Sequence, residues 1–167
     1  MFQTGVIGSS SYQTTGGGVD FLCLPKDPEW LSTSTSASRA SWMHSVEYET
    51  ERYGIVSSSV DDERAVCARC YTQSRPAVMM IPGHYTCPTY WTREYYGYLM
   101  AGEDGQVHPT NYICVYVSPS YYPLSDTNDG GRLHFVIADC SGGGSIEECS
   151  SGEYVHGRAI TCVVCTR

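Results

Sequence analysis

Residues 65–72 read AVCARCYT, and the chain returns to the same pattern at residues 160–166, which read ITCVVCT. Both segments place two cysteines three positions apart within a run of small and β-branched residues, a composition typical of strands. A segment that recurs within one chain is the sequence signature of a duplicated architecture. The recurrence therefore indicates how the chain is divided.

Two further pairs of segments precede this pattern, in the same order in both parts of the chain. Residues 19–24 (VDFLCL) correspond to residues 110–115 (TNYICV), and in each case a proline follows five residues after the cysteine. Residues 43–49 (MHSVEYE) correspond to residues 133–139 (LHFVIAD). All three offsets are roughly ninety residues, as expected for one duplication rather than three chance matches.

We therefore predict an all-β protein, or a β-rich one with minor helix, built from two related disulfide-stapled halves. The halves are residues 1–74 and 75–167, packed about a pseudo-twofold axis into one compact domain. Short apolar runs are separated by glycine and proline turns, and no segment keeps a helical period over three turns. Helix is expected only around residues 28–31 and 61–64, and the Ser/Thr-rich stretch 32–41 is expected to be a surface loop.

The charge and composition exclude several classes of partner. The formal net charge is -8 with only 10 Lys and Arg residues, and such a chain repels the phosphate backbone of nucleic acids. No run of 18 apolar residues exists, so we expect no membrane insertion. Nine cysteines in 167 residues are typical of a protein that works in an oxidising compartment, so we expect a secreted, extracellular protein.

The cysteines are expected to form disulfides within and between the halves. Cys140 and Cys149 bracket a glycine-rich loop, and we predict a local bridge between them. Because nine is odd, at least one thiol has no partner within the chain, which predicts a disulfide-linked homodimer. The two C-x-x-C pairs also resemble a zinc site, but more than ninety residues separate them. The nine candidates for disulfides are Cys23, Cys67, Cys70, Cys87, Cys114, Cys140, Cys149, Cys162 and Cys165.

Two turns in the second half concentrate oxygen ligands. Residues 102–108 read GEDGQVH and residues 125–130 read SDTNDG. Calcium takes six to eight oxygens from carboxylates, amides and carbonyls, and such turns can supply several of them. The alternative is that Asp, Asn and Gly are simply the residues of which turns are made. The predicted Ca²⁺ ligands are Glu103, Asp104, Gln106, Asp126, Asn128 and Asp129.

A calcium ion with open coordination positions suits a sugar-binding protein, because two neighbouring sugar hydroxyls can replace its waters. The side chains expected to contact the sugar are Tyr98, His108, Glu103 and Asn128. The tyrosines before the first turn could equally belong to the core of a β domain. No sequence motif of a hydrolase is present, although a Ser–His–Asp set could still assemble in space.

The chain resembles a known group of proteins in several places. Residues 16–30 (GGGVDFLCLPKDPEW), 80–83 (MIPG), 86–88 (TCP), 94–102 (EYYGYLMAG) and 157–165 (GRAITCVVC) are similar to the globular domains attached to short-chain, spongin-like collagens of invertebrates. The resemblance covers nearly the whole chain. It implies a fold more than an activity, because that family is largely without an assigned function.

Within this group, the size, acidity and odd number of cysteines resemble the small galactose-binding lectins of sea anemones. That resemblance implies a homodimer in which calcium bridges the protein to galactose hydroxyls. The chain departs from the collagen-type members, since it has no Gly-X-Y tract and lacks their cysteine near the start of the first half. Those members commonly lack the acids Glu103 and Asp104, which favours the first turn as an acquired calcium site.

We therefore expect a secreted lectin that binds terminal galactose through calcium and is not an enzyme. The first alternative is an extracellular matrix or adhesive module that binds no small ligand and uses its tyrosines and disulfides for assembly. The second alternative is a secreted hydrolase. Dimerisation favours the lectin, because two linked sites make the second contact with a cell surface intramolecular.

Overall fold

The structure, a computed structural model, describes residues 2–31, 40–123, 130–141, 146 and 149–167. These residues form ten strands and one short 3₁₀ helix, η1 (Ser58–Val60), and no α-helix. The prediction of an all-β, disulfide-stapled protein is therefore confirmed.

The chain divides into two compact units, each of which is described by itself. Unit 1 comprises Met1–Tyr71, Gly102–Asn111 and Pro119–His134, and unit 2 comprises Thr72–Ala101, Tyr112–Ser118 and Phe135–Arg167. The two units interleave along the chain, because two segments of the predicted second half join unit 1. The pseudo-twofold duplication stays a prediction.

Unit 1 is a sheet of mixed direction in which β1 is central. The strand order is β2-β1-β4-β3-β9, and β8 pairs with β4. All pairings within it are antiparallel except that of β3 with β9, which is parallel. Its strands are β1 (Phe2–Ser9), β2 (Leu22–Pro25), β3 (His44–Tyr48), β4 (Arg64–Cys70), β8 (Tyr121–Tyr122) and β9 (Gly131–Phe135).

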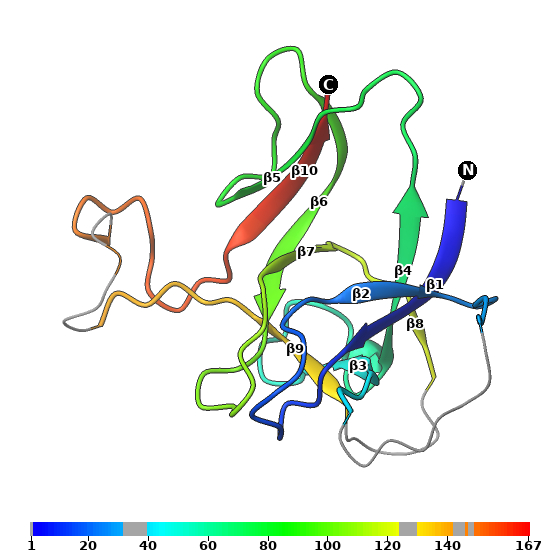
Figure 1. Ribbon diagram of the computed structural model, residues 1–167. Coiled ribbons are helices and arrows are strands. Elements are labelled where there is room, and N and C mark those ends of the chain that lie inside the picture. Colours follow the sequence, from blue (N-terminus) through cyan, green and yellow to red (C-terminus); the bar gives the residue numbers. More distant parts are fainter. Residues whose placement is uncertain (1, 32–39, 124–129, 142–145, 147–148) are drawn as a thin grey trace. The chain divides into compact units, whose positions relative to one another are not determined.

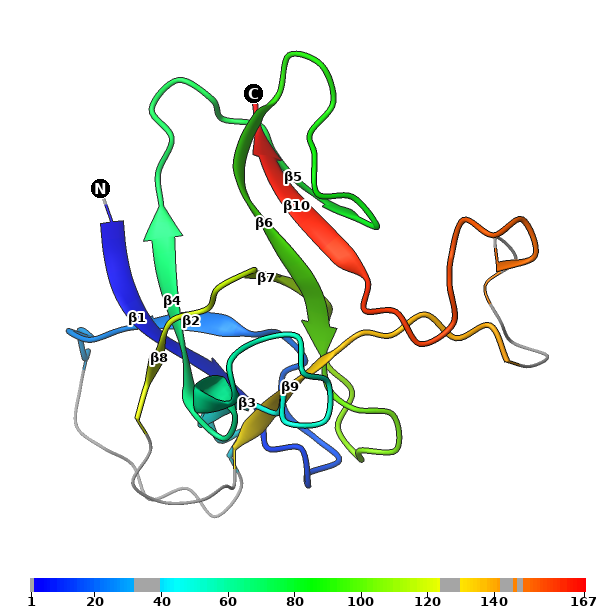
Figure 2. The ribbon, with the colours of Figure 1, turned by 180° about the vertical axis from the view of Figure 1, so that it is seen from behind.

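Unit 2 is an antiparallel sheet with the order β7-β6-β10-β5. In Figure 1 the long strand β6 runs beside β10, with β5 on the other side of β10. The view from behind shows the same neighbours, and in unit 1 it shows β1 beside β4 (Figure 2). The strands of unit 2 are β5 (Val78–Pro82), β6 (Thr92–Ala101), β7 (Ile113–Tyr116) and β10 (Thr161–Thr166).

Alternation of apolar side chains explains where the buried layer of each unit lies. In β9 residues 131, 133 and 135 are buried and those between them are half-buried, as expected for a strand with one face inward. Val46 and Leu133 are fully buried in unit 1, and Val163 is fully buried in unit 2. Such side chains supply the main favourable free energy of folding.

The expected strands are present, but the two central strands were not foreseen. β1 contains Gly5 and Gly8, and β6 opens with the polar run Thr-Arg-Glu, so neither stands out as a short apolar run. The helix expected around residues 28–31 is absent, and near 61–64 only η1 forms. Most of the predicted surface loop, residues 32–39, lies outside the described residues.

β1 and β6 have the same surroundings in their units: each carries a glycine, and a disulfide joins the two strands that flank it. In unit 1, Gly5 of β1 lies opposite Cys67 of β4, while Ile7 lies opposite Cys23 of β2. A disulfide joins Cys23 to Cys67 with a Cα–Cα distance of 5.7 Å, so β2 and β4 approach each other across β1. A Cβ on Gly5 would overlap the backbone carbonyl of Leu24. The strands can therefore approach this closely only with glycine at position 5.

Unit 2 repeats this arrangement position by position. Gly97 of β6 lies opposite Cys162 of β10, and Leu99 lies opposite Cys114 of β7. The Cys114–Cys162 disulfide has the same Cα–Cα distance of 5.7 Å, and a Cβ on Gly97 would overlap the carbonyl of Val115. These correspondences are what a duplication would produce.

All nine cysteines lie in the described part of the chain, and eight of them form four disulfides. Besides the two bridges above, Cys87 pairs with Cys165. The predicted local bridge between Cys140 and Cys149 is confirmed. The expectation of bridges between the halves is wrong, because every bridge closes within residues 1–74 or within 75–167.

The remaining cysteine, Cys70, is free and exposed at the end of β4. It is therefore not part of a disulfide within the chain, although it was among the nine candidates. The zinc alternative is also excluded, because three of the four cysteines that it requires are joined in disulfides.

No helix within the described residues is both long and apolar enough to cross a membrane. Four disulfides in a chain of this length are what proteins of oxidising environments contain.

The close approach of β7 to Gly97 yields a stability prediction. Gly97→Ala should lower the free energy of unfolding by about 1–3 kcal/mol, because the new methyl group must displace the backbone of β7. Gly18→Ala is the matched control, since an added Cβ there meets no atom within 4 Å. Urea denaturation of both variants measures the difference, and equal midpoints would contradict the proposed constraint.

Candidate functional site

The candidate binding site is an open groove in unit 1, formed where the chain leaves β1 and where it enters β3. Its volume is about 700 Å³, within the range of small-ligand sites. The groove is lined by Gln13, Thr14, Thr15, Gly16, Gly17, Ala40, Ser41, Trp42 and His44.

The first wall is a tight turn that follows directly from its sequence. The Thr14 amide and hydroxyl both donate to the carbonyl of Ser11, at 3.2 and 3.0 Å, which closes the turn. The Ser11 hydroxyl in turn accepts from the Gln13 amide at 3.3 Å, as serine commonly does in turns. Gly17 has a φ of +119° and packs against Ser10, so no other residue fits there.

The second wall carries the aromatic surface of the groove. The side chain of Trp42 is 68% exposed, which is unusual for so large an apolar group. Beside it lie the exposed Ser41 and the half-buried His44, the first residue of β3. A Cβ built on Gly17 lies 3.6 Å from the Ser41 hydroxyl, which shows how closely the two walls approach.

A buried histidine lies beneath the first wall. His108 is only 3% exposed, its Nδ1 lies 3.2 Å from the carbonyl oxygen of Thr14, and its Nε2 lies 3.0 Å from that of Gly18. Three residues further on, the Asn111 amide donates to the carbonyl of Val19 at 3.0 Å. Segment 108–111 is thus attached along the loop that forms the wall.

A second network supports the same wall from the other side. The Tyr12 hydroxyl accepts from Nε2 of Gln13 at 2.7 Å, and the guanidinium of Arg132 lies 3.9 Å from the centre of the Tyr12 ring. The Nε of Arg132 is in turn 3.1 Å from Glu47 and 3.0 Å from Glu49. Arg132 therefore forms ion pairs with two carboxylates and a cation–π contact with an aromatic ring.

Carboxylates outnumber cations in this network, and their pKa values reflect it. Burial raises the pKa of Glu47, and repulsion from Glu49 adds to the effect, although Arg132 opposes it. Burial also raises the pKa of Glu49 against the pull of Arg132, with further repulsion from Asp62, Asp61 and Glu103. The electrostatic potential of this part of unit 1 is accordingly negative.

The groove itself has a different chemistry, because none of its nine lining residues carries a formal charge at neutral pH with the His44 ring neutral. It offers hydroxyls, one amide, one imidazole and one flat indole surface. Such groups can donate and accept hydrogen bonds without attracting an ion.

The sequence-predicted calcium ligands are only partly described. Glu103 and Asp104 are exposed and Gln106 is half-buried, whereas Asp126, Asn128 and Asp129 lie outside the described residues. Within the first turn, the Gln106 side-chain oxygen accepts from the Glu103 amide at 3.2 Å. Among the described residues, no three His, Cys, Asp or Glu side chains form a group that could hold a metal ion.

None of the three described residues predicted to contact sugar lines the groove. His108 is buried under the wall with both ring nitrogens facing carbonyls, and Glu103 belongs to the turn just described. Tyr98 belongs to unit 2, where it is half-buried on β6 and meets Phe135 edge to face at 5.4 Å. The fourth, Asn128, lies outside the described residues.

Sequence reasoning missed the residues that do line the groove. The glycines at 16–18 fit the general pattern of turns between strands, and His44 lies in the repeated segment 43–49, where the duplication alone accounts for it. One available signal was Trp42, an aromatic residue that directly follows the Ser/Thr-rich stretch expected to be a surface loop.

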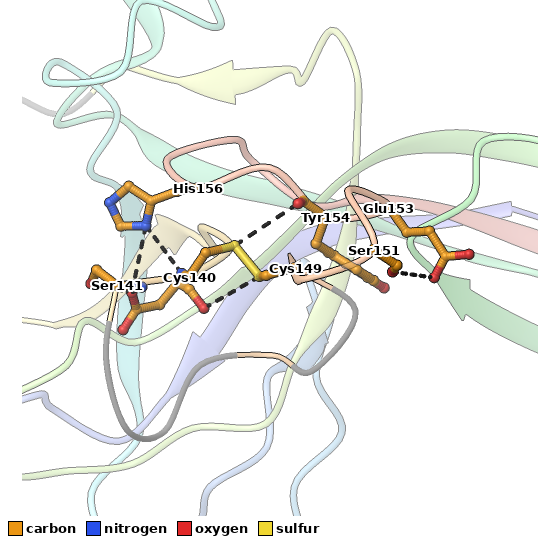
Figure 3. The surroundings of a disulfide bond; sticks show 8 residues. Cys140, Ser141, Cys149, Ser151, Glu153, Tyr154 and His156 are labelled. Carbon is orange, nitrogen blue, oxygen red and sulfur yellow. Dashed lines mark hydrogen bonds and ion pairs between the residues drawn. A yellow bond between two sulfur atoms is a disulfide. The ribbon is translucent and has the colours of Figure 1, made fainter.

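A serine, a histidine and an aspartate do meet in unit 2, beside the Cys140–Cys149 disulfide (Figure 3). The Ser141 hydroxyl donates to Asp139 at 2.6 Å, and Nδ1 of His156 lies 3.5 Å from the same carboxylate. The two hydrogen bonds from Ser141 lower the pKa of Asp139. In a hydrolytic triad the serine hydroxyl donates a hydrogen bond to the histidine. Here it donates to the aspartate instead, so the histidine does not activate the serine.

Comparison with known proteins adds no assignment. The chain matches no protein-family model, no curated protein and no solved structure, so the site has to be interpreted from its own geometry.

The buried ring of His134 predicts a pH dependence of stability. Burial lowers the pKa of His134, an effect that Glu103 opposes, and Nε2 of the ring lies 3.3 Å from Nε2 of Gln106. The unfolded ring therefore binds a proton at a higher pH than the folded ring does. The free energy of unfolding should fall as pH drops through about 6.5 and level off below the folded pKa.

Urea denaturation between pH 8 and 5 measures this effect as the difference between the wild type and His134→Gln. The difference removes the contributions of Glu47 and Glu49, whose raised pKa values act in the opposite direction. Parallel stability curves for the two proteins would contradict the assignment to His134.

Proposed function

We propose that this chain is a secreted carbohydrate-binding protein, a lectin rather than an enzyme, and that it binds sugar in the groove of unit 1. The observation that carries the proposal is the composition of the groove, in which an exposed indole faces uncharged hydrogen-bonding groups. Galactose is the sugar that the sequence resemblance predicts.

The chemistry of a sugar ring matches these groups. A pyranose presents a patch of C–H bonds on one face and hydroxyls around its edge. An indole covers the apolar patch, while hydroxyls, amides and backbone groups of the turn exchange hydrogen bonds with the rim. Each hydrogen bond to the sugar replaces one to water, so it adds little net binding free energy. A single site of this kind therefore binds weakly.

The charge of the protein restricts the class of sugar. No lining residue supplies a cation for a carboxylate or a sulfate, and Arg132 is engaged on Glu47 and Glu49. The net charge of -8 adds long-range repulsion of anions. The groove therefore favours uncharged sugars over sialylated or sulfated ones.

Calcium dependence is the finer part of the proposal. The ion would be held by the turns at 102–106 and 125–130, where Glu103 is exposed and contributes to the negative potential at Glu49 and His134. A divalent cation is attracted to such a potential, and carboxylate oxygens are the ligands that calcium prefers.

A matrix or adhesive module remains the second candidate, and exposed aromatic residues favour it. These side chains offer surface for assembly without any small ligand. The exposed tyrosines among the described residues are Tyr71, Tyr85, Tyr90, Tyr112, Tyr116 and Tyr122.

The lectin proposal predicts the effect of removing the exposed indole. Trp42→Ala should weaken galactose binding about tenfold or more, because the apolar face of the ring loses its partner. Trp30→Ala is the matched control, since Trp30 is 83% exposed in the same unit but does not line the groove. Isothermal calorimetry measures both, and equal losses in the two variants would exclude this groove.

Calcium dependence predicts that a chelator abolishes binding and that added calcium restores it. The matched variant is Glu103→Gln together with Asp104→Asn, which keeps the size of the side chains but removes their charge. Its calcium requirement should shift to at least about tenfold higher concentration. Unchanged galactose affinity in the presence of a chelator would remove calcium from the mechanism and leave the groove in place.

A disulfide-linked homodimer is proposed through Cys70, the free and exposed thiol. Non-reducing electrophoresis of the wild type should show a dimer that Cys70→Ser abolishes. The same variant should retain galactose affinity for a single site but lose agglutination of cells, because avidity needs two linked sites. A wild type that stays monomeric under oxidising conditions would contradict this assignment.

A further inference from the structure

We propose that His108 is the positioning residue of the groove, a role that rests on the proposed sugar binding. Its ring holds the wall formed by residues 13–17 in the shape that the ligand meets. His108 itself does not touch the ligand, because it is buried beneath the wall.

The contact, which we call the clamp, is one hydrogen bond that the ring donates to either of two carbonyl oxygens of the same loop. Nδ1 faces the carbonyl oxygen of Thr14 at 3.2 Å, and Nε2 faces that of Gly18 at 3.0 Å. A carbonyl oxygen only accepts, so each contact needs a proton on the ring nitrogen. Either neutral tautomer carries one such proton, and therefore one end of the wall is bonded whichever nitrogen holds it.

The clamped segment needs this support because of its sequence. Between the two carbonyls lie Thr15, Gly16 and Gly17, and Gly18 follows, so three successive glycines form the end of the wall. Glycine loses more conformational entropy on ordering than any other residue. A wall that is already ordered spares the ligand that cost, which is how preorganisation increases affinity.

The place of His108 in the chain makes the clamp a tertiary device. It lies 94 residues from Thr14 and 90 from Gly18, on the segment 102–111 that belongs to unit 1. The neighbouring bond from the Asn111 amide to the carbonyl of Val19 anchors the same segment just beyond the glycines. The ring thus has a defined base from which to hold the wall.

Two variants of His108 and one control test this role. His108→Leu fills similar space but cannot donate, whereas His108→Gln can still donate to one carbonyl. His156→Leu is the control, because that ring contacts Cys140 and Asp139 in unit 2 and not the wall. Galactose affinity is measured by calorimetry, and hydrogen exchange of amides 13–18 is measured in the free protein.

We expect His108→Leu to weaken galactose binding about tenfold and to accelerate exchange at residues 13–18, with protection of β10 unchanged. His108→Gln should restore most of both, and His156→Leu should change neither. Wild-type affinity and exchange in His108→Leu would overturn the proposal. Loss of β10 protection in His108→Leu would mean that the variant is unfolded. The test is then made on the wild type, in which His108 must show a slowly exchanging ring N–H proton by NMR.

The exchange measurement separates this inference from the proposed function. If the wild type binds no sugar while His108→Leu loosens the wall, the lectin proposal fails and the clamp stands. If the wild type binds galactose while a fast-exchanging ring proton or an unaffected wall is found, the clamp fails and the lectin proposal stands.

Discussion

The close approach of three strands across a glycine is the constraint on which the rest of the structure depends. In each unit the central strand carries a glycine where the flanking strand's carbonyl takes the space of a side chain. A disulfide then joins the two outer strands over the same position. A chain with this few large aliphatic side chains in its core gains from such bridges, which limit the unfolded ensemble by typically about 2–4 kcal/mol each.

The groove follows from how the chain leaves the first of these central strands. β1 ends at the buried Ser9, two further buried serines follow, and the turn at residues 11–17 emerges at the surface. Its hydroxyls are used to close the turn, and its glycines allow the close contact with Ser41. The wall is polar and uncharged because this turn is built from glutamine, threonine and glycine without aspartate, and this composition suits it to sugar hydroxyls.

Electrostatics separate the groove from its surroundings. Arg132 pairs with Glu47 and Glu49 and stacks on Tyr12, and its charge opposes the rise that burial causes in the pKa of both carboxylates. Burying an ion pair of this kind contributes little net stability, but breaking it leaves a buried charge unpaired. The network therefore keeps Tyr12 and the hydrogen-bonded Gln13 in place, while the charged groups stay engaged with one another.

Local patterns in the sequence predicted much of the fold. The repeated segments indicated the strands that became β2, β3, β4, β7, β9 and β10, and a glycine-rich loop indicated the bridge between Cys140 and Cys149. β1 and β6 escaped prediction because their glycines, or the polar residues at their start, interrupt the apolar pattern. Gly5 and Gly97 make room for the carbonyl of a neighbouring strand, and a single segment of sequence does not reveal that neighbour.

The sequence by itself thus determined the all-β class, the reliance on disulfides and the presence of one unpaired thiol, because composition and parity decide these. Only the tertiary structure decided which thiol is free, that His108 lies under a wall ninety residues away, and that Trp42 faces a groove. The reason is physical: strand formation depends on neighbours two residues apart, whereas a site depends on which distant segments the strand pairing brings together.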